Sequence, residues 1–150
     1  MSNLLFRAKA INRIKGREYR TNYKNGDWVY GLITKLYDSR FPLLPAEMKN
    51  TDGVEGIDVD YKTIGQYTGY EVYKNLDDTP TKLFEGDIIE LTDFDINGKD
   101  TQLIGIIKEM GGSLVFENKD TGATLPLYFI DVESDIEIIG NIYDNKELIE

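Results

Sequence analysis

Apolar and polar side chains alternate along the first part of the chain with the period of two that is typical of β-strands. Residues 6–10 alternate apolar with basic side chains and predict a half-buried strand. Residues 17–24 and 27–36 flank Asn25-Gly26, a pair that supplies the positive φ angles of a tight hairpin turn. The pattern therefore predicts one strand followed by a β-hairpin.

Prolines interrupt the segment that follows. Residues 41–45 contain two prolines, which lack the N–H group that an inner strand must donate, so we expect a connector there. Pro45 can begin one helical turn through Lys49. Residues 50–56 are rich in turn formers, whereas residues 59–67 are rich in β-branched and aromatic side chains and predict another strand.

The C-terminal part shows short apolar runs separated by turn-forming residues. Five strands are expected there, at residues 87–91, 103–110, 113–117, 124–129 and 136–140. Five short strands suit an SH3-like small barrel, because closing a sheet removes its exposed edges, and an open meander is the alternative. Asp144 or Asn145 can cap a short helix through Ile149.

The predicted fold is therefore mainly β. We expect a β-rich N-terminal region over residues 1–82, followed by an SH3-like barrel over residues 83–150 that ends in a short C-terminal helix. A chain of 150 residues can bury enough surface for one core or for two small lobes.

Composition narrows the chemistry that the chain can perform. It contains no histidine and no cysteine, so serine–histidine and cysteine–histidine nucleophiles and ordinary zinc sites cannot form. The 27 acidic residues guarantee pairs of carboxylates without identifying one, and a carboxylate-dependent hydrolase remains a third hypothesis. We therefore expect no enzyme, no catalytic, cofactor-binding or metal-binding residues, and no cofactor.

The sequence also bears on the compartment. Residues 4–6 are apolar, but Arg7 and Lys9 follow at once, so there is no apolar signal core, and no run of membrane-spanning length occurs. The lack of cysteine is typical of compartments where disulfides do not persist. We expect a cytoplasmic protein without a membrane partner.

Charge is distributed unevenly. The net charge is −10, yet the residues before position 25 include seven basic residues and one acidic residue, a net +6, which leaves −16 for the rest. Such a surface repels polyanions over most of its extent. The opposite signs suggest internal pairing or head-to-tail association into a homo-oligomer, but solvated outward faces of strands are the favoured explanation.

Two groups of residues suggest ligands. The first is Asp93 to Gly98, which matches the first half of a calcium loop, but Ile104 stands where a bidentate glutamate is needed, so a polar hairpin is favoured. The second combines aromatic residues with the N-terminal basic residues as a stacking platform for single-stranded nucleic acid, with a hairpin core as the alternative. Its aromatic members are Trp28, Tyr30, Tyr37, Tyr19 and Tyr23.

Five motifs occur in an order and spacing that resemble the YopX protein family. They are Phe6-Arg7-Ala8, Trp28-Val29-Tyr30-Gly31, Thr63-Ile64-Gly65-Gln66-Tyr67-Thr68-Gly69, Phe84-Glu85-Gly86-Asp87-Ile88-Ile89 and Ile138-Ile139-Gly140-Asn141-Ile142-Tyr143-Asp144-Asn145. The resemblance implies a phage, prophage or mobile-element protein with a β-rich N-terminal region and an SH3-like C-terminal barrel. It implies no known activity and no functional residues.

The motif glycines also have a physical interpretation. Gly65 and Gly69 bracket a polar-aromatic run, as at a strand bend, and Glu85-Gly86-Asp87 suits a turn whose carboxylate accepts backbone N–H bonds. Both are more consistent with architecture than with catalysis. The leading hypothesis is a non-enzymatic binding module for a host or phage protein. The alternative is nucleic-acid binding by the basic N-terminal hairpin, which the acidic remainder of the chain disfavours.

Overall fold

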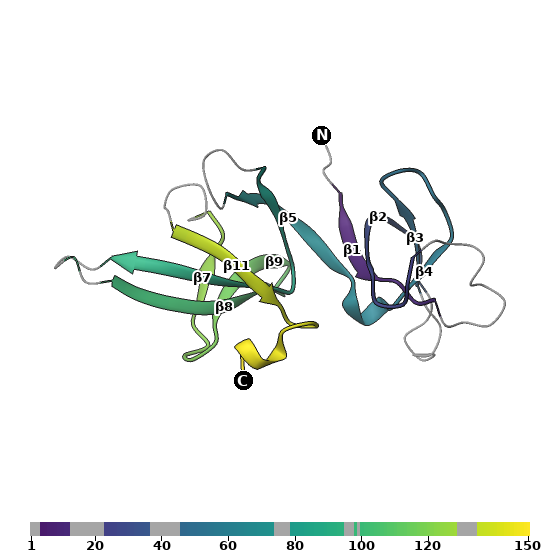
Figure 1. Cartoon of the computed structure of the whole chain (residues 1–150). Coiled ribbons are helices and arrows are strands. Elements are labelled where there is room, and N and C mark those ends of the chain that lie inside the picture. Colours follow the sequence, from purple (N-terminus) through teal and green to yellow (C-terminus); the bar gives the residue numbers. More distant parts are fainter. Residues whose placement is uncertain are drawn as a thin grey trace. The chain divides into compact units, whose positions relative to one another are not determined.

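The computed structural model describes residues 4–12, 23–36, 46–73, 79–94, 98, 100–128 and 135–150, and these are almost entirely β-structure (Figure 1). The strands are β1 (Phe6–Lys9), β2 (Trp28–Lys35), β3 (Ala46–Asn50), β4 (Ile57–Val59), β5 (Gly65–Val72), β6 (Thr81–Phe84), β7 (Asp87–Phe94), β8 (Asp100–Met110), β9 (Ser113–Asn118), β10 (Thr124–Pro126) and β11 (Asp135–Asn141). Two short 3₁₀ turns, η2 (Tyr61–Thr63) and η3 (Lys146–Leu148), complete the described elements. The predicted mainly-β class is confirmed.

The chain forms two compact units, Met1–Tyr67 and Thr68–Glu150. The division expected from the sequence, after residue 82, differs from this one over residues 68–82. Within residues 68–82, Tyr70 of β5 packs against the second core.

Strand β1 organises the first unit, because it has partners on both sides. It pairs with β2 along its whole length and with the start of β5 on the other side. Just beyond β1, Ala10 bridges Val59 of β4, and the Ile11 N–H donates to the Asp58 carbonyl at 2.8 Å. Strand β2 also pairs with β3, and β3 pairs with β4. Because β4 in turn contacts the residues after β1, the first four strands close into a small barrel.

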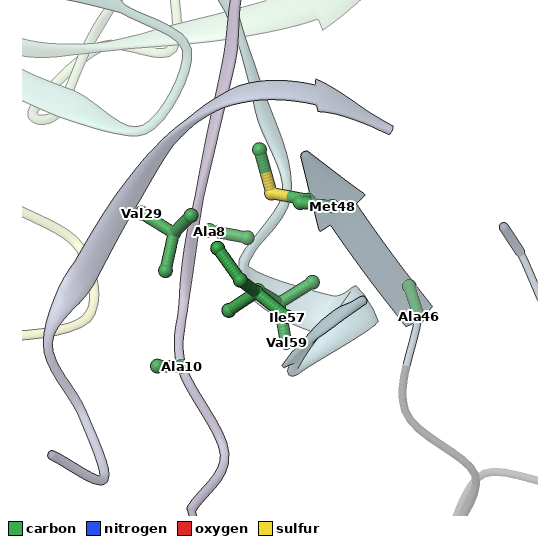
Figure 2. Packing of buried hydrophobic residues seen from close by; sticks show 7 residues of the cluster. All are labelled: Ala8, Ala10, Val29, Ala46, Met48, Ile57 and Val59. Carbon is green, nitrogen blue, oxygen red and sulfur yellow. The ribbon is translucent and has the colours of Figure 1, made fainter. Parts of the chain in front are cut away.

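The interior of this barrel explains the alternation along its strands. One face of each strand supplies the buried core, while the intervening residues face outward. Three of the seven buried core residues described in this unit are alanines, one in β1, one just after it and one at the start of β3. The core residues, drawn in Figure 2, are Ala8, Ala10, Val29, Ala46, Met48, Ile57 and Val59.

Two local predictions in this unit are wrong. The expected helical turn from Pro45 through Lys49 is strand β3 over its described part, because Ala46 and Met48 are buried while β3 pairs with strands on both sides. The expected strand at residues 59–67 is broken by η2. Thr63 Oγ1 stabilises that turn by donating to the Asp60 carbonyl at 2.7 Å and accepting the Lys9 N–H at 2.8 Å.

The turn at Asn25-Gly26 is confirmed. The Asp27 N–H donates to the Lys24 carbonyl at 3.0 Å, and Gly26 has a φ of 93°. Its predicted first arm begins at residue 17, and residues 17–22 lie outside the described part of the chain. The described register pairs β2 with β1, from Phe6 opposite Gly31 to Lys9 opposite Trp28.

The second unit contains a five-stranded antiparallel sheet in the order β10-β9-β8-β7-β11. Strands β7 to β10 form a meander, and β11 returns to pair with β7, as expected for an SH3-like barrel. The buried residues of this core are Leu83, Ile89, Leu91, Ile107, Phe116 and Leu127. The expected C-terminal helix is only the turn η3, and the Asn145 side chain does not cap it.

The Glu85-Gly86 turn joins β6 to β7 and is held by a buried carboxylate. Asp87 Oδ2 accepts the Phe84 N–H at 2.8 Å, and both residues are buried. Gly86 has a φ of 93°; its N–H donates to the Ile107 carbonyl, and its own carbonyl accepts the Ile142 N–H. The Glu85-Gly86 turn therefore links the β6–β7 connection to β8 and to the residue that follows β11.

We predict that Asp87→Ala lowers the free energy of unfolding by about 2 kcal/mol, because the buried Phe84 N–H loses its acceptor. Asp87→Asn keeps an oxygen at this position and should lose less. Urea denaturation of the wild type and both variants measures the difference. Equal stability of Asp87→Ala and the wild type would contradict the structural role of this carboxylate.

Candidate functional site

The outer face of β2 carries a row of large side chains that the first core does not use. Val29 and Gly31 are buried, whereas Tyr30 and Leu32 point the other way and keep 40% and 48% of their surface exposed. Trp28 stands on the same outward face and is half-buried. We call Trp28, Tyr30 and Leu32 the apolar strip.

Two cations of β1 lie along one side of the apolar strip. The strand register places Arg7 opposite Tyr30 and Lys9 opposite Trp28. The guanidinium carbon of Arg7 lies 4.4 Å from the centroid of the Trp28 ring, and Lys9 Nζ lies 5.2 Å from it. Both distances are within the range of cation–π attraction, so the chain's own cations already contact the indole.

Two further cations border the strip toward β3. Lys49 lies opposite Leu32, and Lys35 lies opposite Glu47. Lys49 Nζ is 3.7 Å from Glu55 Oε1, and Lys35 Nζ is 3.8 Å from Glu47 Oε2. The Lys49–Glu55 pair is exposed, and such pairs contribute only about 0–1 kcal/mol, so a carboxylate from another molecule can replace Glu55 at little cost. The Lys35–Glu47 pair is partly buried, because Glu47 keeps only 17% of its side chain exposed.

Gly31 sets the position of the strip. A Cβ atom there would collide with the Lys49 carbonyl oxygen and lie 2.8 Å from Asn50 Cα, both of which are backbone atoms. Only glycine therefore lets β2 approach β3 this closely. Its neighbours Tyr30 and Leu32 are held outward by the same register.

The predicted aromatic platform is assembled only in part. Trp28 and Tyr30 share the outer face with Arg7 and Lys9, as the nucleic-acid hypothesis requires. Tyr23 does not join them, because it packs against the first core and its hydroxyl accepts the Asn50 amide at 3.0 Å. Tyr19 and Tyr37 lie outside the described residues.

Sequence reasoning did not single out Leu32 and Lys49. The alternation that starts at Trp28 contained the signal for Leu32, since residues two apart share a strand face. Lys49 was not identified as a neighbour of the strip because its segment was interpreted as a helical turn. Its place beside the strip follows from the β2–β3 pairing.

The remaining site hypotheses gain no support from the described residues. In that part of the chain no group of three or more acidic residues is arranged to hold a metal ion. The calcium-like pattern falls largely on residues 95–97 and 99, which are not described, and Ile104 lies within β8. The absence of catalytic, cofactor-binding and metal-binding residues stays a prediction. No helix among the described residues is both long and apolar enough to cross a membrane.

The two antiparallel sheets and the turns that join them define a small all-β protein of two units. The chain belongs to the YopX protein family, whose profile matches residues 14–150 and therefore nearly the whole sequence. No curated protein matches the chain. The family resemblance is thereby confirmed, and the matched range contains four of the five motifs, since Phe6-Arg7-Ala8 precedes residue 14.

Proposed function

We propose that this protein is a non-enzymatic binding module, encoded by a phage or mobile element, that engages a protein partner through the apolar strip. The observation that carries the proposal is the exposure of Tyr30 and Leu32 on a sheet face that has Lys9 of β1 on one side and Lys49 of β3 on the other. Tyrosine anchors in a polar rim are typical of protein–protein interfaces. The phage origin rests on the family resemblance.

The rigidity of the surface supports this function. Tyr30 and Leu32 belong to a strand that is paired on both sides, and the opposite face of that strand is buried in the barrel core. A partner would therefore meet side chains whose backbone is already ordered. Preorganisation of this kind reduces the entropy that binding costs.

Nucleic-acid binding is the second candidate, favoured by the shared face of Trp28, Tyr30, Arg7 and Lys9. Two observations make it weaker. The Trp28 ring already contacts two cations of the chain, whereas a stacked base needs an accessible ring face. The net charge of −10 also repels a polyanion.

Two further properties belong to this proposal. The absence of cysteine supports a cytoplasmic location. The contrast between the basic N-terminal segment and the acidic remainder supports association between copies of the chain, which light scattering at low and high salt would test. A monomer at both salt concentrations would rule out that association.

The test of the function is affinity capture from host lysate with matched variants. Tyr30→Thr/Leu32→Thr removes the strip but keeps β-forming residues in β2. Leu125→Thr/Tyr128→Thr makes the same two replacements at exposed positions of the second unit, where 42% and 66% of the side chains are exposed. We expect the strip variant to lose its captured partner about tenfold and the control to retain it. Equal capture by all three proteins would refute a role for this surface.

A further inference from the structure

We infer that the segment bound by the apolar strip is an extended, acidic stretch of protein with apolar or aromatic side chains between its carboxylates. This inference rests on the proposed function and specifies the chemistry of its partner. It follows from the order of side chains across three neighbouring strands, which places cations on both sides of the strip.

The spacing of the face suits an extended chain. Tyr30 and Leu32 are two residues apart on one strand, so their side chains repeat at about 7 Å, which is also the repeat of one face of an extended peptide. Neighbouring strands lie about 4.8 Å apart, so Lys9 on β1 and Lys49 on β3 flank the strip at roughly 5 Å on either side. A segment lying along β2 therefore has apolar contacts beneath it and ammonium groups at both borders.

The charges of the face select an acidic occupant. Lysines from three strands lie on or beside the strip: Lys9, Lys35 and Lys49. Lys49 is held by an exposed ion pair with Glu55, whose carboxylate a partner can replace. Arg7 lies on the same face but is buried, with 6% of its surface exposed. This gathering of positive charge occurs on a chain whose net charge is −10, and complementary charge gives an interface its specificity.

The same charges disfavour two other occupants. A second copy that docked the same face across a two-fold axis would bring these cations against their own like charges. A nucleic acid adds charge along its whole length and would meet repulsion from the acidic remainder of the chain. A short acidic peptide carries fewer charges than a nucleic acid and can place its carboxylates at the borders of the strip.

Selection from a displayed library of random peptides tests the inference on the whole chain. The wild type is the target, and Tyr30→Thr/Leu32→Thr is used for counter-selection, so that only peptides requiring the strip remain. We expect these peptides to be enriched in aspartate and glutamate next to leucine or aromatic residues. Enrichment in lysine and arginine, absence of a charge bias, or failure to enrich any peptide would overturn the inference.

A fluorescence titration with the selected peptides then measures the contribution of charge. Trp28 is the only tryptophan of the chain, so its emission reports on the strip itself. Lys9→Glu/Lys49→Glu should weaken binding about tenfold, because two favourable charge contacts become repulsive. Lys119→Glu/Lys146→Glu makes the same charge change on the second unit and should bind as the wild type does. Lys49→Glu alone, at an exposed position, should give an intermediate loss if the double variant fails to fold.

A single-stranded thymidine oligonucleotide serves as the competing probe in the same titration. No saturable change in Trp28 emission is expected with it at physiological salt. Saturable, strongly salt-dependent binding of the oligonucleotide would overturn the inference in favour of nucleic acid. If the peptides fail while capture from lysate still requires Tyr30 and Leu32, only the acidic specificity is wrong. If capture is also independent of both residues, the proposed function fails as well.

Discussion

Replacing Gly105 with alanine should lower the free energy of unfolding of the second unit by about 3 kcal/mol. The added Cβ would collide with the Glu117 carbonyl oxygen and lie 2.5 Å from both Cε2 and Cζ of Phe116. Phe116 is fully buried in the second core, so its ring cannot turn away without displacing its neighbours. Native-state hydrogen exchange of the β8 and β9 amides measures the loss of stability within these two strands.

Gly112→Ala is the matched control for this change. Gly112 has a φ of 89°, and a Cβ added there would meet no atom within 4 Å, so its alanine variant should lose only about 1 kcal/mol from backbone strain. If Gly105→Ala is no less stable than Gly112→Ala, the close approach of β8 to the Phe116 ring is incorrect. Amides of β1 to β3 provide the internal reference in both experiments.

Gly31→Ala should have a comparable effect on the first unit, again about 3 kcal/mol. The obstruction consists of backbone atoms, the Lys49 carbonyl oxygen and Asn50 Cα, which move only if β2 and β3 separate. Because Tyr30 and Leu32 flank Gly31, the variant should also lose partner binding. Urea denaturation followed by Trp28 emission measures stability, and the capture experiment measures binding.

The control for Gly31 is Gly26→Ala in the turn before β2. Gly26 has a φ of 93° and open space around it, so only about 1 kcal/mol should be lost, and binding should persist. A Gly31→Ala protein that retains wild-type stability would contradict the described β2–β3 register. If the variant is stable and also binds normally, binding by the apolar strip does not depend on this β2–β3 register.

Some positions of the motifs shared with the YopX family have architectural roles in the structure. Gly31 permits the approach of two strands, and Asp87 holds a buried turn. In the last motif, a Cβ on Gly140 would lie 2.5 Å from Asn145 Oδ1, and that oxygen accepts the Asn141 N–H at 3.1 Å.

The successes and failures of sequence-based prediction have physical reasons. The C-terminal strands were predicted because turn-forming residues separate runs that pair with close neighbours in sequence. Strand β3 was missed because Pro45 favours a turn locally, although both partners of β3 are the strands next to it in sequence. The strip was recognised in part, through Trp28 and Tyr30, although alternation along β2 also contained the signal for Leu32. The place of Lys49 beside the strip follows only from the β2–β3 pairing.

The amino-acid sequence by itself determined the β class, the positions of most turns, the uneven charge and the absence of histidine and cysteine chemistry. Alternation showed that β2 has two different faces, but both contain apolar residues, so it did not show which face is buried. Only the tertiary structure decided this, since the barrel closes when β4 returns to the end of β1 and encloses Val29. Burial depends on contacts between distant segments, and these leave Tyr30 and Leu32 exposed between cations from two other strands.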